Sequence, residues 1–95
     1  MRLTLEPGAD IAALVRSAIG ESLVAVIPSA LDALAMAQAR AAIGPLAVEL
    51  APATRVNAVV LAEGADAADV DSAVAFLENA RSTTGQLIEI HQRAP

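Results

Sequence analysis

Two short segments that are apolar on both faces constrain the fold of this chain more than any other feature. Residues 23–27 read LVAVI, and residues 55–62 read RVNAVVLA. The first is too short for a helix, and neither alternates between apolar and polar residues as a half-exposed strand does. Such strands are typical of parallel sheets whose two faces are both covered. The sequence therefore predicts that these two segments are buried parallel strands.

Helical patterns separate the strands. Between residues 11 and 19 the apolar side chains fall at i, i+3, i+4, i+7 and i+8, which indicates a helix with one apolar face. Asp10 is placed to cap its first turn, and Gly20 is expected to end it. The next helix is expected to begin at Ser29 as N-cap, with Asp32 reaching back as the other half of a capping box.

This second helix runs on through alanine to about Leu50, but Gly44 and Pro45 fall inside it. A proline in a helix removes one hydrogen bond and clashes with the preceding turn, at a cost of ~3 kcal/mol. We expect either a kink there or two helices with Pro45 in the first turn of the second. A third helix is expected to start at Asp66 and to carry Arg81 in its last turn, a charge order that complements the helix dipole.

Shorter strand patterns at residues 2–6 and 86–91 complete a β-α-β-α-β-α-β order in one domain, residues 1–95. This order predicts an α/β fold with a small parallel sheet of about four strands. Right-handed crossovers that move steadily in one direction would place every helix on one face of the sheet. Because both faces need cover, either one helix crosses on the opposite side or another chain covers that face.

Composition excludes several classes of partner. The net charge is −5, the basic residues are six scattered arginines, and a single Phe is the only aromatic residue, which disfavours nucleic-acid binding. The absence of Cys excludes disulfides and thiolate metal sites. The N-terminal residues do not resemble a signal peptide, and no apolar run reaches the length of a membrane span. We expect a soluble, cytoplasmic protein.

Three motifs follow one another in a characteristic order. Residues 46–52 read LAVELAP, residues 55–58 read RVNA, and residues 69–77 are followed by Thr-Gly-Gln at 84–86. They resemble the end of the active-site helix, the sixth strand, and the last helix with the start of the seventh strand in short-chain dehydrogenases/reductases, especially those acting on ketones linked to an acyl carrier. The resemblance implies the C-terminal half of a Rossmann-type reductase.

The residues that carry this family's chemistry are missing. The resemblance implies a catalytic Tyr near Asp32 and a Lys near Met36, but the chain contains neither residue type. Its five glycines do not form the Gly-rich loop that binds a dinucleotide, and Glu63-Gly64 stands where the family presents Pro-Gly to the nicotinamide. We therefore expect no catalytic residue and no cofactor, which favours a protein that is not an enzyme.

Isolated polar residues offer weaker sites. His91 and Glu89 share one face of the last strand, and a two-ligand metal corner competes there with a solvated chain end, which we favour. The aspartates at the start of the third helix lack the spacing of a calcium loop. Glu49 is expected to face solvent or to pair with an arginine. Asn57, inside a strand, is expected to make a structural hydrogen bond to a neighbouring loop.

Two functions from different classes remain open, besides a decayed or fragmentary chain that still folds. The first is a non-catalytic, truncated reductase-like protein that acts as an oligomerisation module, either as a homodimer or as a pseudo-subunit bound to a complete reductase-like subunit. The alanine-rich helix faces that would allow close approach are Ala35-Ala39-Ala42 and Ala37-Ala41. The second is a small ligand-binding protein or oxidoreductase-related enzyme. Its site would lie at the carboxyl ends of the strands, lined by Ser29, Asp32, Glu63 and Asp66.

Overall fold

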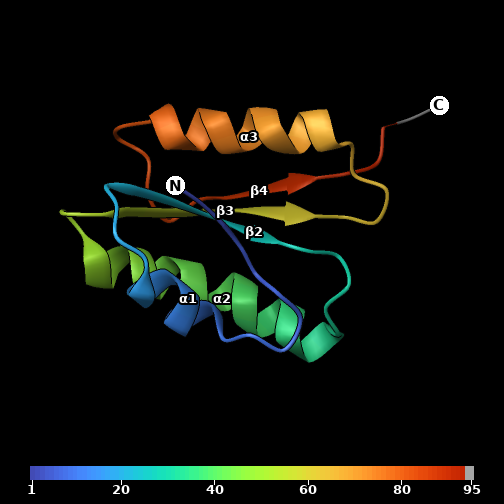
Figure 1. Cartoon of the computed structure of the whole chain (residues 1–95), viewed down its shortest axis with the longest axis horizontal. Coiled ribbons are helices and arrows are strands. Elements are labelled where there is room, and N and C mark those ends of the chain that lie inside the picture. The colour runs from blue at the N-terminus through green and yellow to red at the C-terminus, as the bar shows by residue number, and fades with distance from the viewer. Residues whose placement is uncertain (94–95) are drawn as a thin grey trace.

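The computed structural model describes residues 1–93 and contains a parallel sheet with helices on both faces (Figure 1). In chain order the elements are β1 (Arg2–Thr4), α1 (Ile11–Ser17), β2 (Ser22–Ile27), α2 (Ala33–Leu50), β3 (Arg55–Leu61), α3 (Ala67–Asn79) and β4 (Leu87–Ile90). The four strands lie in the order β1-β2-β3-β4, and each pairs in parallel with its neighbour. The predicted α/β class and four-stranded parallel sheet are confirmed.

The sheet separates two apolar cores because successive residues of a strand point to opposite faces. All six residues of β2 are buried, as the continuous apolar run predicted. Leu23 and Ala25 pack on the side of α1 and α2, whereas Val24 and Val26 pack on the side of α3. The helices complete the first core with Ile11, Val15, Ala39, Ile43, Leu46 and Ala47, and the second with Val70, Val74 and Leu77.

The third crossover has the opposite hand to the first two. Because the strand order moves steadily in one direction, three crossovers of one hand would place all three helices on one face. Instead α1 and α2 cover one face, and α3 covers the other (Figure 1). Of the two arrangements left open by the sequence, the structure has the one in which a helix crosses on the opposite side. The sheet therefore needs no second chain to cover it.

The helices begin at aspartate caps. Asp10 accepts a hydrogen bond at Oδ1 from the Ala12 N–H at 2.9 Å, and Asp32 accepts one from the Ala35 N–H at 2.8 Å. Asp10 was expected as a cap, but the prediction that Ser29 caps α2 is wrong. Residues 28–32 turn the chain from β2 into α2, and Asp32 supplies the N-cap itself because its carboxylate is an equally good acceptor.

Two predicted helix ends are also wrong. The helix α1 ends at Ser17, with Ala18 rather than Gly20 as C-cap, so residues 18–21 turn the chain towards β2. The helix α3 ends at Asn79, which leaves Arg81 in the turn that leads towards β4. Both ends come earlier than the sequence pattern indicated.

Pro45 lies inside α2, which continues as one helix from Ala33 to Leu50. The alternative of two separate helices is therefore excluded. Proline cannot donate to the carbonyl four residues earlier, which here belongs to Ala41. Both Pro45 and Ala41 are exposed, so water can hydrate this carbonyl.

Among residues 1–93, no helix has the length and hydropathy needed to cross a membrane.

Asn57 is fully buried and holds the turn that precedes β4. Its Nδ2 donates to the Thr83 carbonyl at 3.0 Å, and its Oδ1 accepts from the Gln86 N–H at 3.0 Å. Thr84 reinforces this turn, because its hydroxyl accepts from the Val56 N–H at 3.0 Å. The predicted structural hydrogen bond is confirmed, and a buried amide with both ends bonded is stable in a strand.

Candidate functional site

The carboxyl ends of β2 and β3 carry two of the four residues predicted to line a site. Ser29 follows β2 and Glu63 follows β3, and both line one groove of about 310 Å³. The other residues of this rim groove are Met36, Arg40, Val60, Leu61, Ala62, Glu89 and His91. This volume is at the lower end of the range for small-molecule sites, which begins at about 300 Å³.

The other two predicted rim residues do not join this groove. Asp32 caps α2, and Asp66 caps α3 by accepting from the Ala68 N–H at 2.8 Å. Their carboxylates are engaged in holding the starts of two helices. The helix-cap interpretation of Asp66 is confirmed, and the binding role of the rim stays a prediction.

Arg40, Glu89 and His91 form a polar network along the rim groove. The Arg40 guanidinium of α2 donates to Glu89 Oε1 on β4, and His91 Nε2 lies 3.4 Å from Glu89 Oε2. The hydrogen bond and the charge of Arg40 lower the pKa of Glu89. Arg40 was missed by sequence reasoning, because nothing local in the sequence pairs it with a residue on a distant strand.

This network does not make a metal centre or an activated nucleophile. Among residues 1–93, no group of three or more His, Cys, Asp and Glu side chains could hold a metal ion. Ser29 has no hydrogen bond to His91 or to another base within the described chain, and the His91 side chain is 72% exposed. The rim groove presents hydrogen-bonding groups, and among residues 1–93 Ser29 makes no nucleophile–base contact of the kind that covalent catalysis uses.

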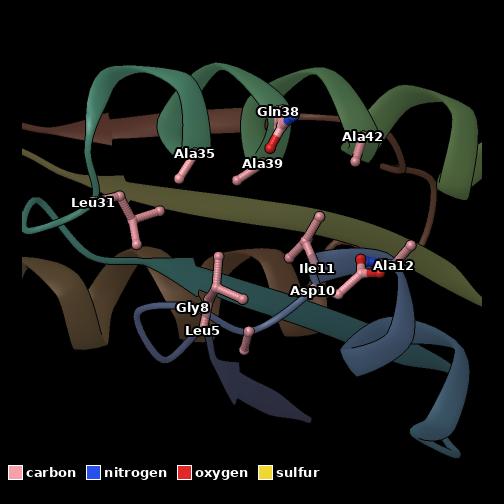
Figure 2. A pocket seen from close by; sticks show the side chains of 11 residues that line it. Leu5, Gly8, Asp10, Ile11, Ala12, Leu31, Ala35, Gln38, Ala39 and Ala42 are labelled. Atoms are coloured by element: carbon pink, nitrogen blue, oxygen red, sulfur yellow. The ribbon is translucent and has the colours of Figure 1, made fainter.

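A second hollow of about 560 Å³, lined by both polar and apolar residues, lies between α2 and the start of α1 (Figure 2). Leu5, Ile11 and Leu31 project into it, and one face of α2 supplies small side chains. That face is Ala35-Ala39-Ala42, which was expected to meet another helix. It does so within the chain, since α1 packs beside α2 and Ala39 is buried. The polar Asp10 at its edge is engaged as the cap of α1.

The opposite, solvent-facing side of α2 carries a continuous uncharged stripe. Its members are all exposed and fall at the helical spacing i, i+3, i+7, i+10, i+11 and i+14. We call Leu34, Ala37, Ala41, Gly44, Pro45 and Val48 the α2 stripe. Leu34 is 69% exposed and Val48 is 79% exposed, so two large apolar side chains extend into solvent at its two ends.

The only two charged residues of α2 flank this stripe and are already paired. Arg40 bonds Glu89 as described, and Glu49 binds Arg16 of α1 through two hydrogen bonds of 2.8 and 2.7 Å. This two-point contact lowers the pKa of Glu49, chiefly through the hydrogen bonds from Arg16, and raises the pKa of Arg16. The expectation that Glu49 faces solvent or pairs with an arginine is confirmed. The α2 stripe itself carries no charge.

The parallel sheet, the helices on both faces and the rim at the strand carboxyl ends define half of a Rossmann-type fold. A family model described as SDR-like, short chain dehydrogenase-like protein, matches residues 6–90. The chain belongs to this family, and the predicted resemblance is confirmed. Comparisons with curated proteins and with solved structures gave no match.

Proposed function

We propose that this chain is a non-catalytic SDR-like protein that self-associates through the α2 stripe. The observation that carries the proposal is the exposure of this uncharged surface along an entire helix. A contiguous exposed patch without charge marks an interaction surface more often than scattered apolar residues do. The lack of Tyr and Lys in the chain supports a role other than reduction.

The spacing of the stripe favours a second copy of this chain as the partner. Leu34 and Val48 each lie seven positions from Ala41, and Ala37 and Pro45 each lie four positions from it. An antiparallel pair of α2 helices about a two-fold axis at Ala41 therefore brings Leu34 of one copy beside Val48 of the other. Such self-complementarity is the requirement of a two-fold symmetric interface.

Small side chains near this axis allow the two helices to approach closely. Ala37, Ala41 and Gly44 lie between the larger side chains at the ends, so backbones can come to the short end of the usual 8–10 Å range. The helix has 18 residues and is therefore about 27 Å long. We expect the dimer to bury more than ~1,000 Å² of largely apolar surface.

Cysteine cross-linking tests both the contact and its symmetry. The chain contains no Cys, so Ala41→Cys introduces a single thiol at the proposed axis. Under mild oxidation we expect rapid formation of a disulfide-linked dimer, because only residues near the axis come close to their own copies. Ala75→Cys is the matched control, since Ala75 is exposed on α3. Equal cross-linking of both variants would contradict the proposed axis.

The antiparallel register has a separate test. Leu34→Cys and Val48→Cys are expected to cross-link poorly when each is alone and efficiently when mixed. Cross-linking of Leu34→Cys with itself would instead indicate parallel helices.

Complex formation with a complete reductase-like subunit, in place of self-association, would appear as a monomeric chain that binds the purified reductase through the same stripe.

A ligand-binding role for the rim groove is the second candidate function. The polar network of Arg40, Glu89 and His91 beside Ser29 favours this groove as a site for a small polar molecule. Titration with NADPH and an assay for ketone reduction separate the two functions. A non-catalytic module gives no saturable signal and no turnover, whereas saturable NADPH binding would favour an oxidoreductase-related protein.

A further inference from the structure

A polar pocket of about 430 Å³ lies at the opposite edge of the sheet from the rim groove, at the amino ends of β2 and β3. All the residues that line it are polar or charged: Glu21, Ser22, Arg55, Glu78, Asn79 and Arg81. The two glutamates and two arginines come from three separate segments of the chain. None of them belongs to the α2 stripe or to the rim groove.

The arginines of this amino-end pocket differ from the other four arginines of the chain. Each of the others forms an ion pair with a carboxylate, in the pairs Arg2–Asp71, Arg16–Glu49, Arg40–Glu89 and Arg93–Asp69. Neither Arg55 nor Arg81 forms an ion pair with any carboxylate among residues 1–93. In a chain of net charge −5, the guanidiniums that remain available to an anion therefore meet at one pocket.

The strand register explains why these groups come together. Ser22 and Arg55 are paired on neighbouring strands, so their side chains leave the same face of the sheet. This is the α3 face, since Val24 and Val59, which lie an even number of positions further along, pack in the α3 core. The end of α3 and the turn after it add Asn79 and Arg81.

Two buried polar atoms belong to residues of this pocket and lack a hydrogen-bond partner within the described chain. They are Ser22 Oγ and Arg55 Nε. The Ser22 residue is only 9% exposed. A buried polar atom without a partner is rare in folded proteins, because it loses its hydration without compensation. Both such atoms occur in adjacent strand residues that line the pocket.

We propose that the amino-end pocket binds a small oxyanion, a carboxylate or a phosphate, through the guanidiniums of Arg55 and Arg81. The planar guanidinium matches two oxygens of such a group. The two glutamates of the pocket carry negative charge, which opposes the binding of an anion. Glu78 is engaged by the Met1 nitrogen at 2.8 Å, which leaves Glu21 as the carboxylate that competes most directly with the anion.

Titration followed by backbone amide NMR shifts tests this site, with inorganic phosphate and succinate as separate probes at low ionic strength. We expect saturable shifts that localise to residues 21–22, 55 and 78–81. Arg55→Gln combined with Arg81→Gln should weaken binding by about tenfold or more, as expected for losing two charge-assisted contacts. Arg16→Gln, which removes the same type of charge on α1, should leave the affinity unchanged.

Glu21→Gln supplies a variant with the opposite expectation. Removing the competing carboxylate should tighten binding by about threefold, a gain that a merely structural disturbance would not produce. Saturation by phosphate alone or by succinate alone identifies which oxyanion the pocket prefers and supports the proposal. Absence of saturable binding by both probes would overturn it, as would equal weakening in Arg16→Gln. Because the α2 stripe is on the other face of the sheet, these outcomes are independent of self-association. Ala41→Glu, which would place two like charges at the proposed dimer axis, should bind the probes normally.

Discussion

The helices α2 and α3 cover opposite faces of the sheet and differ most in what they leave exposed. Each buries an inner row of apolar residues, including Ile43 on α2 and Leu77 on α3. The outer face of α3 mixes polar residues such as Asp71 and Ser72 with the exposed Phe76, whereas the outer face of α2 is the uncharged α2 stripe. An amphipathic helix such as α3 is expected to expose its polar face to water. The absence of this polarity on α2 is the basis for our proposal that a second copy of the chain covers its outer face.

The largest expected effect is on the free energy of unfolding, which should respond very differently to substitutions in the inner and outer rows of α3. Leu77→Ala removes a fully buried side chain and should lower the free energy of unfolding by about 2–5 kcal/mol. Phe76→Ala, at a neighbouring residue that is 63% exposed, should change it by less than about 0.5 kcal/mol. Urea unfolding followed by circular dichroism measures both. A large cost at Phe76 would show that α3 also has a covered outer face.

A smaller effect is expected on the outer face of α2. Leu34→Ser should weaken self-association about tenfold, the equivalent of about 1.4 kcal/mol, because one exposed apolar anchor is lost from each half of the interface. Sedimentation equilibrium at several protein concentrations gives the dissociation constant. Ser72→Ala on the exposed side of α3 is a control that should leave this constant unchanged.

The smallest expected effect is the contribution of the ion pairs between each helix and its neighbours to the free energy of unfolding. Hydrogen bonds from Arg16, Arg40 and Arg93 lower the pKa values of Glu49, Glu89 and Asp69 respectively. Since these pKa values are lower in the folded than in the unfolded chain, the stabilisation is present above the ordinary carboxylate range and is lost as pH falls through the folded pKa values. The free energy of unfolding should therefore decrease as pH falls below about 4.3.

Variants assign this pH dependence to its pairs. Arg16→Gln combined with Arg40→Gln removes both pairs of α2 and should flatten the acid limb of the stability curve. Arg2→Gln is the control, because it removes the ion pair with Asp71 and leaves both pairs of α2 intact. An acid limb that is unchanged in the double variant would assign the pH dependence to other groups.

The fold was predictable where one local pattern was sufficient. The run LVAVI at residues 23–27 predicted β2, because both its faces are apolar and both prove to be buried. The position of Ser29 misled the prediction of the start of α2, since serine and aspartate are comparable caps and both precede the same apolar row. The side on which α3 crosses could not be assigned, because crossover hand depends on the whole sheet and not on the helix sequence.

The candidate sites were less predictable because they depend on contacts between distant residues. Ser29 and Glu63 lie at one edge of the sheet, because the carboxyl ends of parallel strands meet there. Arg40 also lines this groove, where it pairs with Glu89 on the distant strand β4. The Ala35-Ala39-Ala42 face was expected to meet another helix, but sequence composition could not distinguish α1 of the same chain from a helix of a second chain.

The molecular mass in solution tests the central claim most directly. Light scattering coupled to size-exclusion chromatography at micromolar concentration should give twice the chain mass of 9.6 kDa for the wild type. Ala41→Glu places two like charges at the proposed axis and should give the monomer mass, whereas Ala75→Glu on α3 should remain a dimer. Circular dichroism checks that both variants are folded. A wild-type protein that is monomeric at these concentrations, or a dimer that persists in folded Ala41→Glu, would contradict self-association through the α2 stripe.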